Sequence, residues 1–353
     1  MWVHQMVDGR DHRRLPARRL GGRIEGLQLW RVPQALRHGL AAAAATRVVV
    51  LNDEDGERIV RWQRVRREKI HVVPHGVDLE RFRFDGAGRE RLRREWNVTD
   101  DVVPIVGTAG RLVPGKGIER LIEVAARLRD RGINLLLVIA GEGPQRAAGV
   151  RLAERLGVAE AVRWAGFVED MAGYYSALDV FALCSATESF GLAVAEAMAC
   201  ERVVIGTPTA GARRQIEHGR TGWQLEGFGV DELADGLAAL LGRRGRFAEM
   251  GRRARASVAR RFSIDRTLDR TLRALGMPVG RGAAGRPCAA IEGDVEPPMN
   301  ADGRRWIRPS GRIGYAVDGS HTLQAEQESE DRGPTGRWGI EVPCEAFTAE
   351  GGS

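Results

Sequence analysis

The sequence predicts an α/β protein whose main domain is a parallel sheet with helices on both faces. Over residues 104–274, apolar runs of about five residues alternate with longer amphipathic stretches, as strands and helices do in such a sheet. Glycines and charged residues gather in the turns between these runs. The composition, 43% hydrophobic and 29% charged, is that of a globular protein.

The elements of the main domain follow from hydrophobic periodicity. Strands are expected at Ile105–Thr108, Leu135–Ala140, Val162–Ala165, Val180–Leu183 and Val203–Gly206. Helices are expected at Ile118–Asp130, Gln145–Leu156, Met171–Ala177, Leu192–Ala199, Val230–Leu241 and Arg246–Arg261, with a short one inside 211–222. Ligands bind beyond the carboxyl ends of the strands in such sheets, so the chemistry should lie in the strand-to-helix loops.

Residues 1–73 are arginine-rich and hold a smaller set of candidate elements; the family resemblance given below implies that they are the remnant of an N-terminal domain on the acceptor side. Strand candidates are Met1–Met6, Arg47–Leu51 and Ile70–Val73. The stretch Asp53–Arg66 predicts a helix, with Ile59, Trp62 and Val65 on one face.

The remaining segments differ from the main domain in composition and hydrophobic pattern. Residues 74–103 hold Pro74, Gly76, Gly86 and Gly88 among charges, which is typical of a connector between domains. Residues 275–353 have isolated apolar residues and no period, so a disordered tail is expected there.

The excess positive charge of the chain lies near its N-terminus. Residues 1–73 hold 15 Lys and Arg against 8 Asp and Glu, a net of +7, which equals the formal charge of the whole chain. Such a patch could contact an anionic membrane or a phosphorylated acceptor, or it could be a solvated arginine-rich face. Nucleic-acid binding is not expected, because no recognition motif accompanies the charge.

Two features that the sequence lacks indicate the cellular compartment of the protein. No apolar run reaches the roughly 20 residues that cross a bilayer, and no apolar segment follows the basic N-terminus. The cysteines have neither zinc-site nor disulfide spacing; they are Cys184, Cys200, Cys288 and Cys344. We therefore expect a cytoplasmic protein without a metal site, with peripheral contact at the inner face of the membrane through the basic segment.

The loop after the first strand of the main domain carries two cations. Gly110 to Lys116 fits the phosphate-binding loop of nucleoside triphosphatases, G-x-x-x-x-G-K. In that loop the next residue is Ser or Thr, which binds magnesium, whereas this chain has Gly117. Arg111 and Lys116 remain as fixed cations that could neutralise a diphosphate without a metal; the alternative is a plain surface turn.

Two further loops are weaker signals. Gly141 and Gly143 directly follow the second strand, where glycines let a ligand approach the backbone closely. Val168 lies after the third strand and could meet a nucleotide base through backbone groups. Many αβ connections have such residues for purely structural reasons.

The loop at residues 188–199 is the most specific of the set. A helix should begin near Gly191, so the free amides of Gly191 and Leu192 favour a phosphate. Glu188 then lies in the loop and Glu196 about one and a half turns into the helix, and each carboxylate could accept hydrogen bonds from sugar hydroxyls. Helix capping plus a surface glutamate is the structural alternative.

Taken in order, these segments resemble the retaining glycosyltransferases of family 4, which have the GT-B fold of two Rossmann-like domains. The resemblance covers about Trp30 to Ala274 and is strongest from Val73 to Gly222. Its marks are VVPHGVDLERF, GRLVPGKG, AGEGP, GFVED, ESFGLAVAEAMA and EHGRTG.

The resemblance implies transfer of a sugar from a nucleotide-diphosphate-sugar to a carbohydrate or lipid-linked acceptor, with no cofactor besides the donor and with UDP, GDP and ADP all compatible. The implied catalytic residues are Arg111, Lys116 and Glu188. The implied donor-binding residues are Gly110, Gly141, Gly143, Val168, Phe190, Gly191, Leu192 and Glu196.

The chain also departs from the pattern of the family. Cys200-Glu201-Arg202 stands where glycine and proline are usual, and the glycine-rich loop of a full first domain is missing. His4 and His12 are the histidines that could lie on the acceptor side. A truncated first domain keeps three alternatives open: a nucleotide-sugar-binding protein without turnover, a P-loop nucleotidase, and a GT-B epimerase or hydrolase.

Overall fold

The computed structural model describes residues 44–98, 102–281 and 287–289. The chain divides into two compact units, Met1–Gly276 and Met277–Ser353. The strand expected at Met1–Met6, the histidines His4 and His12 and most of the basic N-terminal segment lie outside the described residues. No helix among those described is long and apolar enough to cross a membrane.

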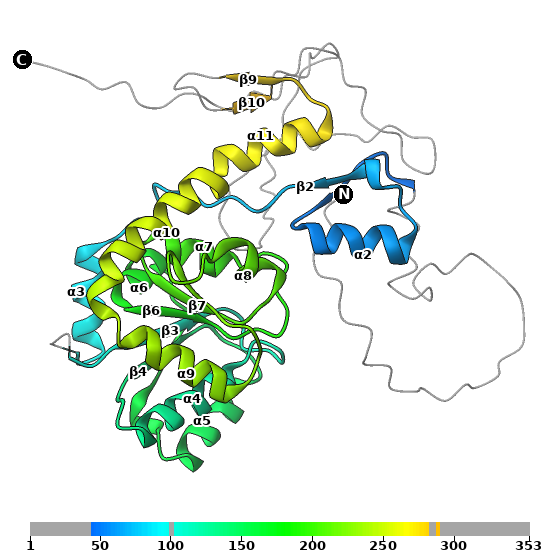
Figure 1. Ribbon diagram of the computed structural model, residues 1–353. Helices are drawn as coiled ribbons and strands as arrows, with labels where there is room; N and C mark the ends of the chain where they lie inside the picture. The colour runs from blue at the N-terminus through cyan, green and yellow to red at the C-terminus, as the bar shows by residue number, and fades with distance from the viewer. Residues whose placement is uncertain (1–43, 99–101, 282–286, 290–353) are drawn as a thin grey trace, which may run out of the picture. The chain divides into compact units, whose positions relative to one another are not determined.

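The first unit is built on a six-stranded parallel sheet, and this confirms the expected fold class (Figure 1). The spatial order is β5-β4-β3-β6-β7-β8. The strands are β3 (Ile105–Ala109), β4 (Leu136–Ala140), β5 (Val162–Gly166), β6 (Val180–Leu183), β7 (Val203–Gly206) and β8 (Gly222–Gln224). The chain winds outward from β3 in one direction and from β6 in the other, so the switch point lies between β3 and β6.

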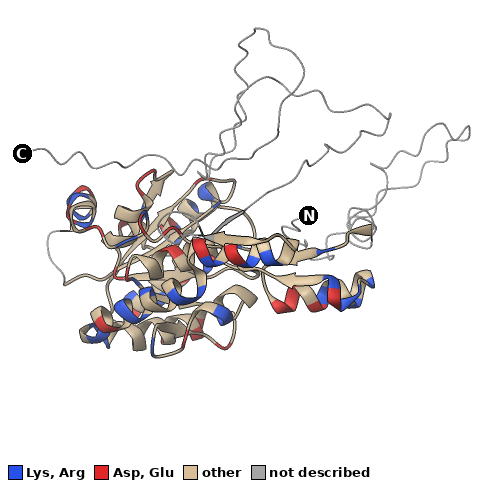
Figure 2. Cartoon of the chain, turned by 90° about the horizontal axis from the view of Figure 1, so that it is seen from above, with Lys and Arg blue, Asp and Glu red and all other residues tan. Residues whose placement is uncertain are grey.

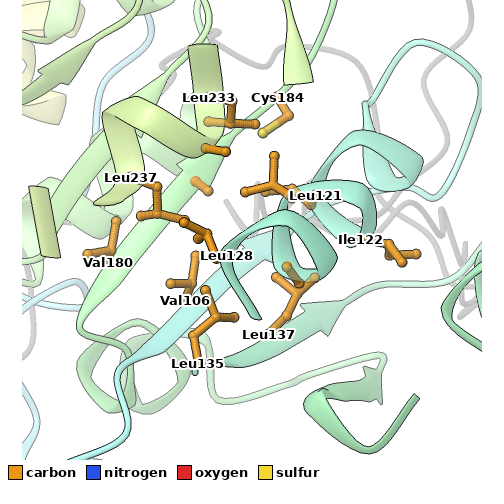
Figure 3. Close-up of a cluster of buried hydrophobic side chains, with 14 of the residues drawn as sticks. Val106, Leu121, Ile122, Leu128, Leu135, Leu137, Val180, Cys184, Leu233 and Leu237 are labelled. Atoms are coloured by element: carbon orange, nitrogen blue, oxygen red, sulfur yellow. The ribbon is translucent and has the colours of Figure 1, made fainter. Parts of the chain in front are cut away.

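Helices cover both faces of this sheet, which is why its strands are nearly continuous runs of apolar residues. On one face, α4 (Ile118–Asp130), α5 (Arg146–Arg155) and α9 (Val230–Leu241) pack on β3 and β4 through residues such as Leu121 and Leu237 (Figure 3). On the other face lie α6 (Met171–Ala177), α7 (Leu192–Ala199) and α10 (Phe247–Phe262). The unit is completed by α8 (Ala210–Gln215) and α11 (Ile264–Leu275).

The expected connector at 74–103 contains a helix that the sequence did not indicate, α3 (Gly86–Glu95). Its ten residues include two glycines, six charged residues and a single large apolar residue, Leu92, so hydrophobic periodicity gives no signal. The helix forms through tertiary contacts instead. It packs on α6, and its Arg93 is buried and donates to the carbonyl of Ala177 at 2.9 Å.

A buried carboxylate joins α3 to two strands. Asp179 immediately precedes β6 and is 9% exposed. One of its oxygens accepts from the Arg93 guanidinium at 2.7 Å, and the other accepts from the backbone N–H of Ile105, at the start of β3, at 2.8 Å. A single side chain therefore holds the amino ends of β3 and β6 against α3.

Residues 44–73 form a small element of their own. The expected strands are present as β1 (Val48–Val50) and β2 (Ile70–Val72), a parallel pair, with α2 (Asp53–Gln63) between them. Ile59 and Val65 are buried as expected. Trp62 was wrongly placed on that buried face: it is 72% exposed, because two three-residue strands offer too little surface to cover a third large side chain.

Short elements also occur in places where none was expected. β8 and α11 were not indicated, and in the second unit β9 (Val279–Arg281) pairs antiparallel with β10 (Pro287–Ala289). The expectation of a tail without regular structure therefore does not hold for these two strands. Residues 290–353 of that tail lie outside the described part of the chain.

Candidate functional site

A pocket of about 280 Å³ opens at the carboxyl ends of β3 and β6, beside the switch point. It is lined by residues from the loop after β3, the loop after β6 and the start of α7, with one residue each from the ends of β1 and β2. The lining residues are Leu51, His75, Thr108, Ala109, Gly110, Arg111, Lys116, Ile118, Leu183, Ser185, Glu188, Ser189, Phe190, Gly191, Leu192 and Ala193. The structure thus brings together seven of the eleven site residues expected from the sequence.

Lys116 and Glu188 form an ion pair inside this pocket. Both side chains are mostly shielded, with exposed fractions of 26% for Lys116 and 14% for Glu188. The same Glu188 oxygen also accepts a hydrogen bond from the Ser185 hydroxyl at 3.0 Å. The two charges therefore neutralise each other, and an incoming anion would compete with Glu188 for the lysine.

Arg111 is the second cation of the pocket. Its side chain is exposed and forms no ion pair with any residue in the described part of the chain. Arg111 lines the pocket from the loop after β3, as Lys116 does. The arrangement fits a diphosphate, whose charge and size suit two separate cations better than one.

Gly117 explains why the loop after β3 does not work as a triphosphatase loop. Its φ is +74°, a left-handed conformation that favours glycine, and a Cβ atom there would lie 2.1 Å from the carbonyl oxygen of Cys184. The turn is also tied to the loop after β6 by a 2.7 Å hydrogen bond from Ala186 N–H to the Gly115 carbonyl. A serine or threonine cannot occupy this position without moving β6, so the magnesium-binding hydroxyl has no place here.

Gly141 and Gly143 do not line the pocket but support the loop that does. A Cβ atom on Gly141 would lie 1.9 Å from the Gly110 carbonyl oxygen, and one on Gly143 would lie 2.4 Å from that of Leu112. The two backbones are joined by a hydrogen bond from Leu112 N–H to the Glu142 carbonyl at 2.8 Å. These glycines permit close contact between the two loops, and their expected contact with a ligand remains a prediction from the sequence.

Gly141→Ala should therefore destabilise the protein by at least about 1–3 kcal/mol, the cost of forcing a side chain into a strained backbone region. Gly132→Ala is the matched control, because Gly132 also has a positive φ, +77°, but open space around its Cβ position. Denaturant unfolding of the two variants measures the difference. If the two variants lose equal stability, the close approach of the two loops adds nothing to the cost of Gly141→Ala.

The start of α7 closes one side of the pocket. Gly191 caps the helix in a left-handed conformation, with φ +80°. Phe190 is buried and lies edge-on to His75 and Phe262, with ring centroids 5.7 and 5.4 Å apart. Phe190 thus forms part of the pocket wall and fixes where the helix begins, whereas Leu192 is 42% exposed and open to a ligand.

Glu196 and Val168 do not reach the pocket in this structure. Val168 packs against the apolar cluster beneath α6 and α7. Glu196 accepts a hydrogen bond from the Tyr175 hydroxyl at 2.7 Å. Burial raises the pKa of the Glu196 carboxyl, and the Tyr175 hydrogen bond and Arg81 lower it by less. A donor role for these two residues remains a prediction from the sequence.

The raised pKa of Glu196 gives a pH-dependent expectation. A carboxyl whose pKa is higher in the folded state adds stability at low pH and loses that contribution as the pH rises through the folded pKa. Glu196→Gln removes this titration and keeps an acceptor for Tyr175. The variant should therefore gain stability relative to the wild type as the pH rises from about 4.5, its ordinary pKa. Denaturant unfolding between pH 4 and 8 measures this difference, and a difference that falls with pH would contradict the account.

Nine residues that line the pocket are not among the expected site residues, and Leu51, His75 and Ser185 are three of them. The spacing of Ser185 three residues before Glu188 is typical of a hydroxyl that bonds a carboxylate in a tight loop, and it could have been read from the sequence. In the sequence, His75 occurs only within the segment VVPHGVDLERF and has no expected role of its own. Its place in the pocket depends on how residues 44–77 meet the sheet, for which the sequence carries no signal.

Residues 44–55 contact the pocket loop directly. The buried Asn52 side chain caps α2 and donates to the Ser189 carbonyl at 2.6 Å. At the same end of α2, Asp53 and Glu54 pair with Arg214 and Arg213 of α8. Asn52 at the start of α2 therefore holds the loop that bears Glu188, and the acidic first turn of α2 holds α8. Among the described residues, no group of three or more His, Cys, Asp or Glu is placed to hold a metal ion.

The parallel sheet, with a cationic pocket at its switch point next to a helix N-terminus, has a fold that is shared with solved GT-B structures. Residues 89–257 match the family model described as "Glycosyl transferases group 1". These residues run from within α3 to within α10 and include every expected site residue, so just under half of the chain is similar to this family.

Curated glycosyltransferases are also similar to this chain. The chain is 34% identical over 205 residues to a GDP-mannose-dependent alpha-(1-6)-phosphatidylinositol monomannoside mannosyltransferase of Mycobacterium tuberculosis, covering 56% of this chain and 53% of that protein. It is 36% identical over 226 residues to a D-inositol 3-phosphate glycosyltransferase of Nocardia farcinica, covering 62% and 49%. The chain thus spans about half the length of the curated relatives it matches.

Two crystal structures share the fold at low sequence identity. Anabaena HepE in complex with UDP and glucose superposes with a TM-score of 0.64 at 23% identity, over 69% of this chain and 66% of that one. WaaG, a glycosyltransferase involved in lipopolysaccharide biosynthesis, superposes with a TM-score of 0.60 at 22% identity, over 71% and 70%.

Proposed function

We propose that the pocket between β3 and β6 binds a nucleotide-diphosphate-sugar and that the protein transfers its sugar, with retention of anomeric configuration, to a carbohydrate or lipid-linked acceptor. The observation that carries this proposal is the meeting of Arg111, Lys116 and Glu188 in one pocket beside the N-terminus of α7. Two cations and one carboxylate there match the two halves of such a donor, a diphosphate and a sugar.

The chemistry needs an anion to be stabilised as it leaves. The bond between the anomeric carbon and the diphosphate oxygen breaks, a bond to the acceptor oxygen forms on the same face, and the acceptor proton passes to the leaving diphosphate. Arg111, Lys116 and the helix N-terminus at Gly191 face the position where this negative charge develops. Fixed cations and oriented dipoles lower the barrier most when they are already in place before the reaction.

The Lys116–Glu188 pair suggests how the donor enters. When the diphosphate takes Lys116, Glu188 loses its cation and becomes free to accept hydrogen bonds from the sugar hydroxyls. Ser185, which donates to the same carboxylate, keeps it oriented. Binding of the diphosphate and binding of the sugar are then coupled. A diphosphate bound without a sugar would take Lys116 and leave Glu188 without a partner for its charge.

Names of the relatives guide the choice of substrates to test. A mannosyltransferase relative uses GDP-mannose, and others act on D-inositol 3-phosphate, so GDP-mannose with inositol-containing acceptors belongs in the panel. UDP- and ADP-sugars complete it, since no residue described above selects among the three nucleotides.

A transfer assay with purified protein tests the proposal. Release of nucleoside diphosphate that depends on both a donor and an acceptor, with the new glycoside seen by mass spectrometry and its anomeric configuration by NMR, would support it. Donor binding without any release would favour a nucleotide-sugar-binding protein. Release without an acceptor would favour a hydrolase. Inversion at the anomeric carbon would overturn the retaining part alone.

A further inference from the structure

A second cavity lies at the opposite end of the sheet from the pocket between β3 and β6, which we call the donor pocket. It has a volume of about 740 Å³, within the range of cavities that bind small ligands. Asp179 precedes β6 and Arg202 precedes β7, so this cavity opens at the amino ends of the strands. Its charged lining residues are Arg89, Asp179, Glu201, Arg202, Arg244 and Arg252; we call it the arginine pocket.

The arginines of this pocket outnumber the carboxylates. Asp179 accepts from Arg93 at 2.7 Å, and it also faces Arg89 at 3.5 Å and Arg244 at 3.7 Å. Asp179 thus lies within 4 Å of three guanidinium groups. Acidic and basic residues are interspersed along the helices drawn in Figure 2, whereas four arginines and two carboxylates, Asp179 and Glu201, line this pocket.

Two of the arginines are held rigidly by the backbone. Arg89 and Arg202 both donate to the carbonyl of Leu178, just after the end of α6, at 3.3 and 3.1 Å. Burial and, to a smaller extent, the positive charge of Arg89 together lower the pKa of Arg202 to about 10. Guanidinium groups that are already fixed, and that repel each other, gain more from an added anion than mobile surface arginines do.

Other features of the pocket favour an organic anion. Arg252 is exposed and forms no ion pair or hydrogen bond with any residue in the described ranges. Phe84 is 44% exposed, and the Arg202 guanidinium stacks on its ring at 4.9 Å. Phe247 adds a second aromatic ring to the lining. The pocket thus offers cationic donors next to apolar surface.

We propose that the arginine pocket binds a small organic phosphate, with the phosphate among Arg202, Arg244 and Arg252 and the organic part against Phe84. The alternative is that the arginines serve only to bond the carbonyls at the end of α6 and Asp179. The two accounts differ at Arg252, which takes part in neither of these structural contacts. The proposal is independent of sugar transfer.

Binding should be measured by calorimetry in the Lys116→Ala background, which weakens phosphate binding in the donor pocket. At constant ionic strength, the probes are inorganic phosphate, glucose 6-phosphate and AMP. We expect saturable binding of at least one organic phosphate, reduced about tenfold or more by Arg252→Ala, because hydrogen bonds between charged groups are the strong ones. Tighter binding of AMP than of glucose 6-phosphate would show that the aromatic wall contributes.

The neighbouring residue supplies the control. Arg253 lies on the same helix but pairs with Glu249 and does not line the cavity, so Arg253→Ala should leave binding unchanged. Equal losses in the two variants would mean a diffuse charge effect and would overturn the proposal. Absence of saturable binding by all three probes, or binding that Arg252→Ala does not change, would overturn it as well.

Discussion

Replacing Lys116 with alanine should lower the rate of sugar transfer by about 10²–10³-fold, the effect seen when one fixed donor to a developing negative charge is removed. Lys116 is the shielded cation of the donor pocket, and its only ion pair within the described ranges is with Glu188. The loss should fall mainly on kcat, because the charge on the diphosphate grows as the bond to the sugar breaks. Initial rates at saturating donor measure it.

The chain provides its own control for this variant. Lys69 is the only other lysine in the sequence, and it donates to the Ala45 carbonyl beside β2, away from the pocket. Lys69→Ala should leave kcat within a factor of two or so of the wild type. If both variants lose activity equally, or if Lys116→Ala keeps most of its activity, Lys116 does not stabilise the leaving group.

Replacing Asp179 with alanine should destabilise the fold by about 3–5 kcal/mol, the usual result of removing one partner from a buried ion pair. The variant leaves the buried Arg93 without its carboxylate and the Ile105 N–H without its acceptor. It also removes the carboxylate that lies within 4 Å of Arg89, Arg93 and Arg244. Denaturant unfolding monitored by fluorescence measures the change.

Asp235→Ala is the comparison for this variant. Asp235 pairs with Arg131 on the surface, and its side chain is 67% exposed, so its removal should cost no more than about 1 kcal/mol. A loss at Asp179 as small as that at Asp235 would show that Asp179 does not hold α3 to the sheet. The account of the α3 contacts would then have to be revised.

The sequence predicted most of the main domain, because its strands and helices bury continuous apolar runs or faces. The bounds of β6, β7, α4, α6 and α7 agree with the structure residue for residue. Elements that depend on tertiary contacts were missed. The helix α3 rests on arginines that bond to α6 and Asp179, and β8 is only three residues long, so neither leaves a periodic signal.

The candidate site, too, was predicted only in part from the sequence. Arg111, Lys116 and Glu188 could be brought together because the carboxyl ends of neighbouring parallel strands meet at one edge. The ion pair between Lys116 and Glu188 could not be predicted, since it depends on the shape of two loops. The packing of one loop on another at Gly141 and Gly143 could not be predicted either, because a glycine in a turn gives no sign of what approaches it.

The central claim is that the pocket between β3 and β6 holds the diphosphate of a nucleotide. The most direct test is denaturant unfolding of the wild type, Lys116→Ala and Lys69→Ala with and without GDP, UDP or ADP. A nucleotide present at 100 times its dissociation constant should stabilise the wild type and Lys69→Ala by about 2.7 kcal/mol, and Lys116→Ala by much less. Equal stabilisation of all three proteins, or none by any nucleotide, would contradict the claim.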